Sequence, residues 1–429
     1  MKKRAILLWF RNDLRVHDNE TLVRACNDSD LVIPVFCLDT NVLNGVQFGI
    51  PRIGSRRLAF LLESVADLKK SLQLLGGDLL VKIGKPVDAI RDLAVEYNVQ
   101  AVYCSAEFTS EEIEQERSLE SELHHHGIPL KKYWASTLLH PQDLPFAISN
   151  IPDIFTSFRN KVENKFHYRE VYETPIKIST PNFNTNIPSI AELGFPSFET
   201  ESRAAFNLAG GETTALKHLE NYIWKDQHIS TYKLTRNGMV GMGYSGKFSP
   251  WLANGSLSAR QITTEVNRFE NEVEKNESTY WMIFELLWRD FFKFTFLKYG
   301  NNLFQLNGNK TARQPWNRDL TIFENWKSGQ TGDDFVNANM IELNGSGWMS
   351  NRGRQNVASY LVHDLGIDWR WGAAYFEQQL IDYDPSSNWG NWAYVAGVGN
   401  DPRPFRKFNT QKQANDYDKD STFRKLWLK

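Results

Sequence analysis

The 429-residue sequence has little of what defines several protein classes. It contains only three cysteines, Cys26, Cys37 and Cys104, which are too few and too scattered for a disulfide framework or a thiolate metal site. The basic start, MKKRAILLWFR, holds an apolar run of only six residues, too short for a secretory signal or a membrane span. These absences predict a soluble, intracellular protein in a reducing compartment, the cytoplasm.

The sequence also lacks a large net charge and several common motifs. The formal net charge is −2, so any nucleic-acid site has to be a local basic patch. No GxGxxG follows the first strand-like run and no GxxxxGK[ST] occurs, which disfavours a nicotinamide dinucleotide site and an NTPase P-loop. HExxH and paired Cys/His spacings are absent, so no metal site is predicted.

Aromatic residues, in contrast, are abundant and unevenly placed. They make up 13% of the chain and include 14 tryptophans. Only Trp9 and Trp134 precede residue 200. The two halves of the chain are therefore expected to be different kinds of structure.

The first third alternates continuous apolar runs with segments of helical spacing. Strands are expected at 5–10, 31–39, 78–84, 100–107 and 128–134, and helices at 55–75, 87–98 and 110–125. This alternation predicts an α/β fold with a doubly wound parallel, Rossmann-like sheet. Ser55 is expected to cap the first of these helices. Ligands of such a sheet lie at the carboxyl ends of its strands, here along 11–19 and after Ala106.

Three regions follow from these patterns. Residues 1–134 form the α/β domain, and residues 135–205, rich in Pro, Ser, Thr and Asn, form an interdomain connector with a short helix near 155–165. In residues 206–429 apolar side chains recur at spacings of three and four residues, which predicts an all-α domain of about ten helices.

The most unusual stretch is LIDYDPSSNWGNWAYVAGVGN, residues 380–400. Asp382 and Asp384 precede Asn388 and a cluster of large aromatic side chains. Because Pro385 lacks an N–H and biases its neighbour toward extended backbone, an irregular, ordered loop is expected from Asp382 to Asn388. The stretch indicates a pocket for a flat, polar ligand. The alternative is a core loop whose aspartates cap helices.

A second candidate lies on the expected helix FELLWRDFF, residues 284–292. Glu285, Trp288 and Arg289 share one face of it. A solvated Glu285–Arg289 ion pair is the ordinary interpretation, but an indole between the two charges also suits a cavity for an aromatic ligand. The core-facing residues of the same helix are expected to be Phe284, Leu287 and Phe291.

Two more segments carry polar groups at the start of a helix. Asn351, Arg352, Arg354 and Gln355 lie within about one turn and suit phosphates and pyrimidine edges, or they are exposed residues beside a helix cap at Ser350 or Asn351. The segment 244–249, YSGKFS, offers hydroxyls, backbone amides and a lysine, as a phosphate cradle or a Ser-rich capping turn would.

Together these motifs resemble one known family. RAILLWFRNDLRVHDN, YSGKFSPWLANGSLSARQ, FELLWRDFF, GSGWMSNRGRQNVASYLVHDLGIDWRWG and LIDYDPSSNWGNWAYVAGVGNDPRPF occur in order over essentially the whole chain. They are similar to the DNA photolyase/cryptochrome family, and most of all to its cryptochrome DASH branch. The resemblance implies an N-terminal antenna-binding domain and a C-terminal domain that holds FAD in a bent conformation.

The resemblance also assigns roles to residues. Asp382 and Asp384 match carboxylates that face the flavin and adenine side, Asn388 matches the residue beside the isoalloxazine N5, and Arg354 matches a cation near them. Trp392, Trp369 and Trp316 match a chain of indoles that conducts electrons from the surface to the flavin. The phosphates and the ribityl chain are assigned to Tyr232, Ser245, Gly246, Lys247, Phe248 and Ser249.

The lesion pocket is assigned in the same way. Glu285 matches a hydrogen-bond or proton donor to a pyrimidine dimer, and Trp288 matches the wall on which the dimer stacks. Further contacts to the lesion or the DNA backbone are assigned to Asn351, Arg352, Gln355 and Tyr394. Most photolyases have Met and Trp where this chain has Gln355 and Tyr394, a difference that the DASH branch shares and that puts repair of intact duplex in doubt.

The expected activity is therefore that of a deoxyribodipyrimidine photo-lyase. Reduced, light-excited FAD would split cyclobutane pyrimidine dimers, preferentially in single-stranded DNA, and the protein is expected to be a monomer. A blue-light receptor that signals through flavin photoreduction is the alternative, although the lack of an extended tail after PFRKFN favours repair. RNA is left open as a further partner. Methenyltetrahydrofolate is the antenna that the resemblance implies, with Glu107 as a contact.

Overall fold

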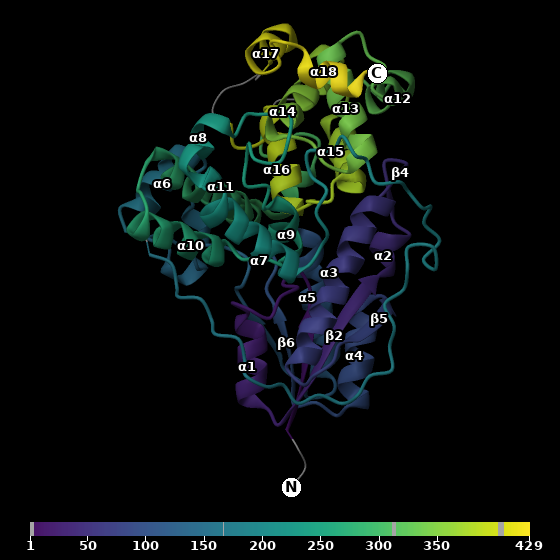
Figure 1. The fold of residues 1–429 in the computed structure, drawn as a ribbon. Coiled ribbons are helices and arrows are strands. Elements are labelled where there is room, and N and C mark those ends of the chain that lie inside the picture. Colours follow the sequence, from purple (N-terminus) through teal and green to yellow (C-terminus); the bar gives the residue numbers. More distant parts are fainter. Residues whose placement is uncertain (1–3, 166, 311–314, 402–406) are drawn as a thin grey trace.

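The computed structural model describes residues 4–165, 167–310, 315–401 and 407–429. The chain forms an α/β part at one end and a helical part at the other (Figure 1). Residues 402–406, which complete the last of the sequence motifs above, and the basic tip at residues 1–3 lie outside the described residues. In the described part, no helix is both long and apolar enough to cross a membrane.

The α/β part is built on one five-stranded parallel sheet, as predicted. The strand order is β5-β2-β1-β6-β7. The strands are β1 (Ala5–Phe10), β2 (Leu31–Asp39), β5 (Leu80–Gly84), β6 (Ala101–Ser105) and β7 (Leu130–Tyr133). Because the chain winds outward from β1 in both directions, the order reverses between β1 and β6, the topological switch point of a doubly wound sheet.

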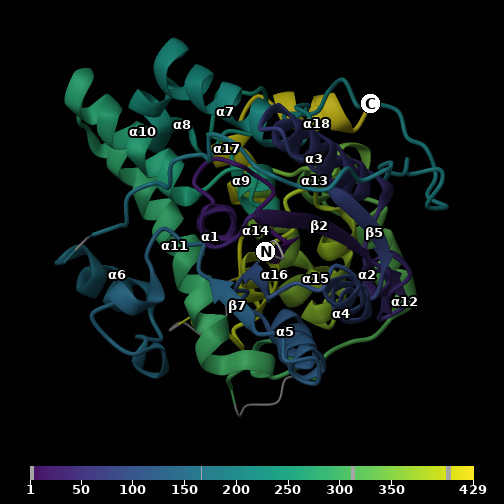
Figure 2. The ribbon, with the colours of Figure 1, turned by 90° about the horizontal axis from the view of Figure 1, so that it is seen from below.

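Helices cover both faces of this sheet. All six residues of β1 are buried, as its continuous apolar run predicted. Leu8 packs with side chains of the helices on one face, and Leu7 packs with those on the other. The first face carries α1 (Glu20–Asp28) and α3 (Ser55–Leu74), and the second carries α4 (Pro86–Glu96) and α5 (Ser110–His124). Figure 2, from below, places α4 and α5 on the opposite side of the sheet from α3.

One helix start differs from the prediction. Ser55 is the first residue of α3, not its cap, because Gly54 already has extended backbone and forms the boundary. No side chain caps this end. The carbonyl of Gln378 instead accepts a hydrogen bond of 2.8 Å from the Gly54 N–H, so the helical part supports this boundary.

The connector crosses the surface of both parts. It contains α6 (Phe155–Glu163), close to the predicted helix at 155–165. Backbone hydrogen bonds attach it to the α/β part at Val32 (to the Ser179 carbonyl, 2.9 Å) and at Asp18 (to the Tyr172 carbonyl, 3.1 Å). Domain boundaries at 134 and 205 stay a prediction.

The described residues after 205 form mainly helices joined by loops. Their longest element, α11 (Glu277–Tyr299), runs through the centre of this part and buries Phe284, Leu287 and Phe291, as predicted. The others are α7 (Glu212–Glu220), α8 (Tyr232–Thr235), α9 (Ser249–Asn254), α10 (Ala259–Glu272), α12 (Leu320–Lys327), α13 (Asp334–Ser346), α14 (Asn351–Ser359), α15 (Trp369–Gln379), α16 (Pro385–Val395), α17 (Thr410–Tyr417) and α18 (Thr422–Trp427).

The two parts meet at the carboxyl end of β1. There Arg15 donates to the carbonyl of Gly255 (2.8 Å), and Asp18 forms a buried ion pair with Arg260 (2.8 Å). Gly255 has φ +72°, and a Cβ on it would lie 1.9 Å from the Asn12 carbonyl oxygen, so only glycine fits. The segment 11–19 was predicted to line a ligand crevice, but the helical part packs against it.

Candidate functional site

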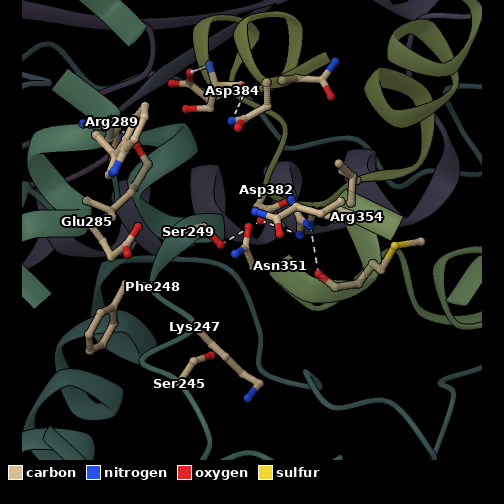
Figure 3. Close-up of a pocket in the computed structure, with 18 of the residues that line it drawn as sticks. Ser245, Lys247, Phe248, Ser249, Glu285, Arg289, Asn351, Arg354, Asp382 and Asp384 are labelled. Atoms are coloured by element: carbon tan, nitrogen blue, oxygen red, sulfur yellow. Dashed lines mark hydrogen bonds and ion pairs between the residues drawn. The ribbon is translucent and has the colours of Figure 1, made fainter. Parts of the chain in front are cut away.

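The helical part contains a cavity of about 640 Å³. Its walls come from α11, α14, α16 and the segment 244–249 (Figure 3). Sixteen of the predicted site residues line it: Tyr232, Ser245, Gly246, Lys247, Phe248, Ser249, Glu285, Trp288, Asn351, Arg354, Gln355, Asp382, Asp384, Asn388, Trp392 and Tyr394. Trp369, Trp316 and Arg352 do not line it. Residues separated by more than 150 positions in the sequence therefore share one site.

Asp382 is held by two partners on the cavity wall. Arg354 makes a two-pronged ion pair with it, with nitrogen–oxygen distances of 3.0 and 2.8 Å. The Ser249 hydroxyl donates to the same carboxylate at 2.7 Å (Figure 3). This pairing ties α14, α9 and the segment before α16 together, so the side of the cavity nearest to Asp382 is rigid and polar.

Asp384 plays a different part. It caps α16 by accepting a hydrogen bond from the Ser387 N–H at 2.8 Å, and it forms a buried ion pair with Lys293 at 2.8 Å. The predicted irregular loop from Asp382 to Asn388 is therefore wrong, because Pro385 is the first residue of a helix, where its missing N–H costs nothing. The alternative interpretation, an aspartate cap, holds for Asp384.

The acid stability of the protein is expected to depend on this pair. Burial disfavours ionised Asp384, but the Lys293 and Arg289 cations and two hydrogen bonds outweigh it and lower the pKa of Asp384 from 3.8 to about 2. Because the folded-state pKa lies below the unfolded one, ionised Asp384 stabilises the fold above about pH 4. That contribution, about 2 kcal/mol, is lost as the pH falls toward 2.

Unfolding measured from pH 5 to pH 2 tests this. Lys293→Met is expected to lower the free energy of unfolding at pH 5 by about 3 kcal/mol, because it leaves a buried charge unpaired. The difference in the free energy of unfolding between this variant and the unmodified protein is expected to narrow by about 2 kcal/mol toward pH 2. A difference that stays constant over this range would show that Lys293 does not act through Asp384.

Asn388 and Trp392 lie one turn apart on α16. The Asn388 amide donates to the Ala373 carbonyl at 2.9 Å, which fixes its orientation at the cavity wall. Trp392 contacts α15 so closely that a Cβ on Gly372 would lie 2.2 Å from its ring. Gly372 follows Trp369 by three residues, so Trp392 meets α15 one turn beyond Trp369.

The predicted tryptophan chain lies in a single core cluster. Trp369 is fully buried, Trp316 is partly buried, and both pack in the cluster that contains Trp392. The ring contacts pair Trp392 with Trp326 (6.2 Å between centroids) and Trp369 with Trp389 (5.8 Å). The order of transfer through Trp392, Trp369 and Trp316 stays a prediction.

Lys247 does not extend toward the carboxylates. Its ammonium donates to the Met242 carbonyl (2.8 Å) and lies 3.3 Å from the centroid of the Tyr244 ring. Figure 3 shows it pointing away from Asp382 and Glu285. Burial lowers the pKa of Lys247 to about 7. The predicted phosphate cradle therefore depends on the backbone of this segment more than on the lysine charge.

The opposite wall carries the predicted lesion residues. Glu285 pairs with Arg236 and not with Arg289, which donates instead to the carbonyls of Ser136 and Leu252. The ordinary interpretation of the sequence, a solvated Glu285–Arg289 pair, is therefore wrong. Burial raises the pKa of the Glu285 carboxyl, against the lowering effect of Arg236.

Aromatic rings support this wall from behind. Trp288 stacks on Phe155 with centroids 3.7 Å apart, and Tyr394 meets it edge to face at 6.2 Å. The ring orientation is therefore fixed by a residue of the connector, far away in the sequence. A rigid indole is a suitable surface for a planar base.

Arg352 lies just outside the cavity. It donates to Gln355 (3.0 Å) and Asn237 (2.8 Å), and its guanidinium lies 4.4 Å from the centroid of the Tyr417 ring. Ser350 caps α14, as one of the sequence interpretations proposed. The contacts of Arg352 hold it beside Gln355, which does line the cavity.

Two functional candidates were missed by sequence reasoning: Arg236 lines the cavity, and Lys293 pairs with Asp384 behind it. Arg289 also lines the cavity, as the alternative interpretation of its shared helix face with Glu285 and Trp288 proposed. A single lysine within the apolar run FFKFTF was a usable signal, because a buried cation needs a buried partner. Arg236 carried no such signal, since its partner lies 49 residues away.

Glu107, the predicted contact of the folate antenna, does not line either cavity. Glu107 is buried at the carboxyl end of β6 and accepts a hydrogen bond from Asn12 at 3.0 Å; burial raises its pKa to about 7. A second cavity of about 300 Å³ lies between the two parts, but Glu107 does not line it. Residues from both parts do: Arg52, Thr109, Glu111, Glu112, Glu377, Tyr383 and Trp389 among them. The folate antenna stays a prediction.

The main cavity fits FAD. Its volume lies in the range of cofactor sites, and its polar groups gather in two regions with an aromatic wall opposite. One region, at Gly246 to Phe248, offers backbone N–H groups that form no hydrogen bond among the described residues, as an anion requires. The other, at Asp382 and Asn388, offers a carboxylate and an amide beside buried apolar side chains, as a polar ring edge requires.

Comparison with known proteins agrees with this geometry. The family described as FAD binding domain of DNA photolyase matches residues 281–429, and the family described as DNA photolyase matches residues 6–178. A Gloeobacter violaceus protein named cryptochrome DASH is 49% identical over 100% of this chain and 86% of its own length. A Xenopus laevis protein of the same name is 47% identical over 99% and 82%.

Solved structures give the same result. A cryptochrome from Synechocystis superimposes with a TM-score of 0.96 at 48% identity, covering 100% of this chain and 89% of that one. An archaeal photolyase from Sulfolobus tokodaii, solved with two FAD molecules, gives 0.80 at 28% identity, covering 99% and 90%. The chain therefore belongs to the DNA photolyase/cryptochrome family of FAD-binding proteins. Within that family it is most like the proteins named cryptochrome DASH.

Proposed function

We propose that this protein is a light-driven lyase that repairs cyclobutane pyrimidine dimers, preferentially in single-stranded DNA. The observation that carries the proposal is that one cavity holds both the residues that fit FAD and the wall formed by Glu285 and Trp288. A lesion on this wall would lie directly beside the cofactor, as electron transfer over a short distance requires. Bound, reduced FAD supplies the light-driven electron that opens the dimer.

The residues of the chain position the reactants. Trp288 offers its indole face to the dimer and is held in place by Phe155. Glu285, whose pKa is raised by burial, can hold a proton on its carboxyl and donate it in a hydrogen bond to a pyrimidine carbonyl once Arg236 moves to a DNA phosphate. Asn351 and Gln355 add amide groups to the same pocket.

The preference for single strands follows from the binding cost. Extracting a paired lesion from a duplex costs a few kcal/mol that an unpaired lesion does not. Tyr394, which contacts Trp288 edge to face, offers a smaller ring than the Trp that most photolyases have there, so less stacking energy is available to compensate for that cost. The same pocket suits dimers in RNA. Binding is expected to weaken with salt, because Arg236 and Arg352 would contact phosphates.

The proposal includes the oligomeric state and the compartment of the protein. It acts as a monomer in the cytoplasm, where its three free cysteines, Cys26, Cys37 and Cys104, stay reduced. Burial raises the pKa of each thiol, most clearly at Cys37 and Cys104, to about 12, which keeps them unreactive.

Irradiation of a defined substrate tests the proposal. Protein with chemically reduced FAD is mixed with a single-stranded oligonucleotide that contains one thymine dimer and is exposed to blue light; restored thymines are measured by chromatography. Repair is expected, with weaker repair of the matching duplex. Glu285→Ala is expected to lower single-strand repair roughly tenfold and to leave the flavin spectrum unchanged, because it removes one hydrogen bond to the lesion.

A blue-light receptor is the second candidate. The cluster that joins Trp392 to buried tryptophans supports it, because light-driven reduction of FAD needs such donors and repair by reduced FAD does not. Absence of restored thymines, together with light-dependent binding of a partner protein, would favour the receptor. Binding of DNA or RNA without any photochemistry would contradict both.

A further inference from the structure

The segment Tyr244–Phe248 presents several unused backbone donors to the cavity. Among the described residues, the N–H groups of Gly246, Lys247 and Phe248 form no backbone hydrogen bond, whereas that of Ser245 closes a turn toward Met242. Each of these residues lines the cavity. Gly246, Lys247 and Phe248 are buried residues, and consecutive N–H groups without partners are rare in buried segments, so a ligand that accepts hydrogen bonds is expected here.

The backbone conformation focuses these donors. Lys247 is in the left-handed region with φ +48°, and Phe248 follows in the right-handed region with φ −77° and ψ −11°. Successive residues of opposite hand form a nest, in which neighbouring N–H groups point into one concavity and bind an anion. A left-handed conformation is uncommon for lysine and needs support from its surroundings.

The Lys247 side chain does not provide that anion contact in this structure. Its ammonium is engaged by the Met242 carbonyl and the Tyr244 ring. The direction of the peptide groups therefore decides how well the nest binds. The peptide between Gly246 and Lys247 is the critical one, because it carries the Lys247 N–H, the first donor of the nest.

His218 is the residue that orients this peptide. It lies in the last turn of α7, and its Nε2 is 2.8 Å from the carbonyl oxygen of Gly246. A carbonyl can only accept, so Nε2 carries the hydrogen. In a planar trans peptide the C=O and the following N–H point in opposite directions. A bond that holds the Gly246 carbonyl toward His218 therefore turns the Lys247 N–H away from His218, toward the ligand side.

We propose that His218 is a positioning residue that sets the anion nest for the diphosphate of FAD. It does not line the cavity and would not touch the cofactor. The proposed effect passes through the Gly246–Lys247 peptide. The inference rests on the FAD site of the proposed function, and not on the DNA repair activity assigned to it.

A packing role is the ordinary interpretation of this histidine. Its ring lies 5.5 Å from Phe248 and 5.4 Å from Trp251, centroid to centroid, and burial lowers its pKa. Packing alone predicts that a large apolar side chain is a good replacement. The proposal predicts that only a side chain with a hydrogen-bond donor is.

Cofactor affinity measured on apoprotein separates these interpretations. FAD and riboflavin, which has no phosphate, are titrated into the unmodified protein, His218→Leu and His218→Gln, with flavin fluorescence as the signal. H218L is expected to bind FAD about tenfold more weakly and riboflavin within twofold of the unmodified protein, since one hydrogen bond behind the phosphates is lost. H218Q keeps a donor and is expected to recover most of the FAD affinity.

His140→Leu is the matched control. This histidine also bonds to the backbone, accepting from the Gln142 N–H at 3.2 Å, but it lies in the connector outside the cavity. H140L is expected to bind both ligands normally. If H218L does not fold, H218M against H218Q gives the same comparison.

Three results would overturn the proposal. They are unchanged FAD affinity in H218L, an equal loss for riboflavin and FAD, and an H218Q variant as weak as H218L. Because the signal is flavin binding, failure of dimer repair would leave this test unaffected.

Discussion

Asp382→Asn is expected to weaken FAD binding by about 30- to 150-fold, which corresponds to the roughly 2–3 kcal/mol of hydrogen bonds to a charged group. The substitution leaves the Arg354 guanidinium without its two-pronged partner and replaces one of its acceptor oxygens by an NH₂ group. The Ser249 hydroxyl loses a charged acceptor as well. The polar side of the cavity would then no longer hold one geometry.

The chain offers a closely matched control for this change. Asp418 and Arg424 form an ion pair at 2.9 Å whose side chains are 2% and 22% exposed, against 2% and 24% for Asp382 and Arg354. Asp418→Asn is therefore expected to destabilise the fold to a similar extent while FAD affinity stays normal. Equal losses of FAD affinity in both variants would mean that Asp382 acts only through general stability. Titration of apoprotein with FAD, beside thermal unfolding, measures both quantities.

Trp392→Phe is expected nearly to abolish light-driven reduction of bound, oxidised FAD. Trp392 is the tryptophan of the predicted chain that lines the cavity, and phenylalanine is much harder to oxidise than indole. Trp392 packs closely on Gly372, and the phenylalanine ring is smaller than the indole, so it should fit there without strain. Absorbance of the flavin during blue-light exposure in the presence of an external reductant gives the rate.

Trp326→Phe is the control for this prediction. Trp326 is fully buried and contacts the same ring at 6.2 Å, but it lies outside the predicted chain. Near-normal photoreduction is expected in W326F, and protein reduced chemically beforehand should repair dimers in both variants. A slow W326F beside a fast W392F would show that the electron takes a route other than Trp392, Trp369 and Trp316.

Much of the architecture could be predicted from local patterns. The continuous apolar run of β1 required burial on both faces, and the alternation of strands and helices then led to the doubly wound sheet that the structure contains. The apolar stripe of α11 predicted its core residues for the same reason, since side-chain periodicity follows directly from backbone geometry.

The errors came from places where local and distant contacts compete. Asp384 and Pro385 were expected to lie in a loop, but a proline at the first position of a helix fits as well as one outside a helix, and only the packing of α16 selects between them. Glu285 was expected beside Arg289, four residues on. In the folded protein Glu285 pairs with Arg236, and Arg289 donates to two backbone carbonyls.

The sequence by itself determined the α/β and helical halves, the family, and sixteen of the residues around the cavity, because these depend on hydrophobic periodicity and on motifs that are continuous in the chain. Tertiary structure alone decided which charges pair, that Lys247 turns away from the carboxylates while Lys293 pairs with Asp384, and that His218 reaches Gly246. Such pairings depend on distance and burial in three dimensions. Coulomb and hydrogen-bond energies fall off within a few ångströms, a scale that separation along the chain does not reveal.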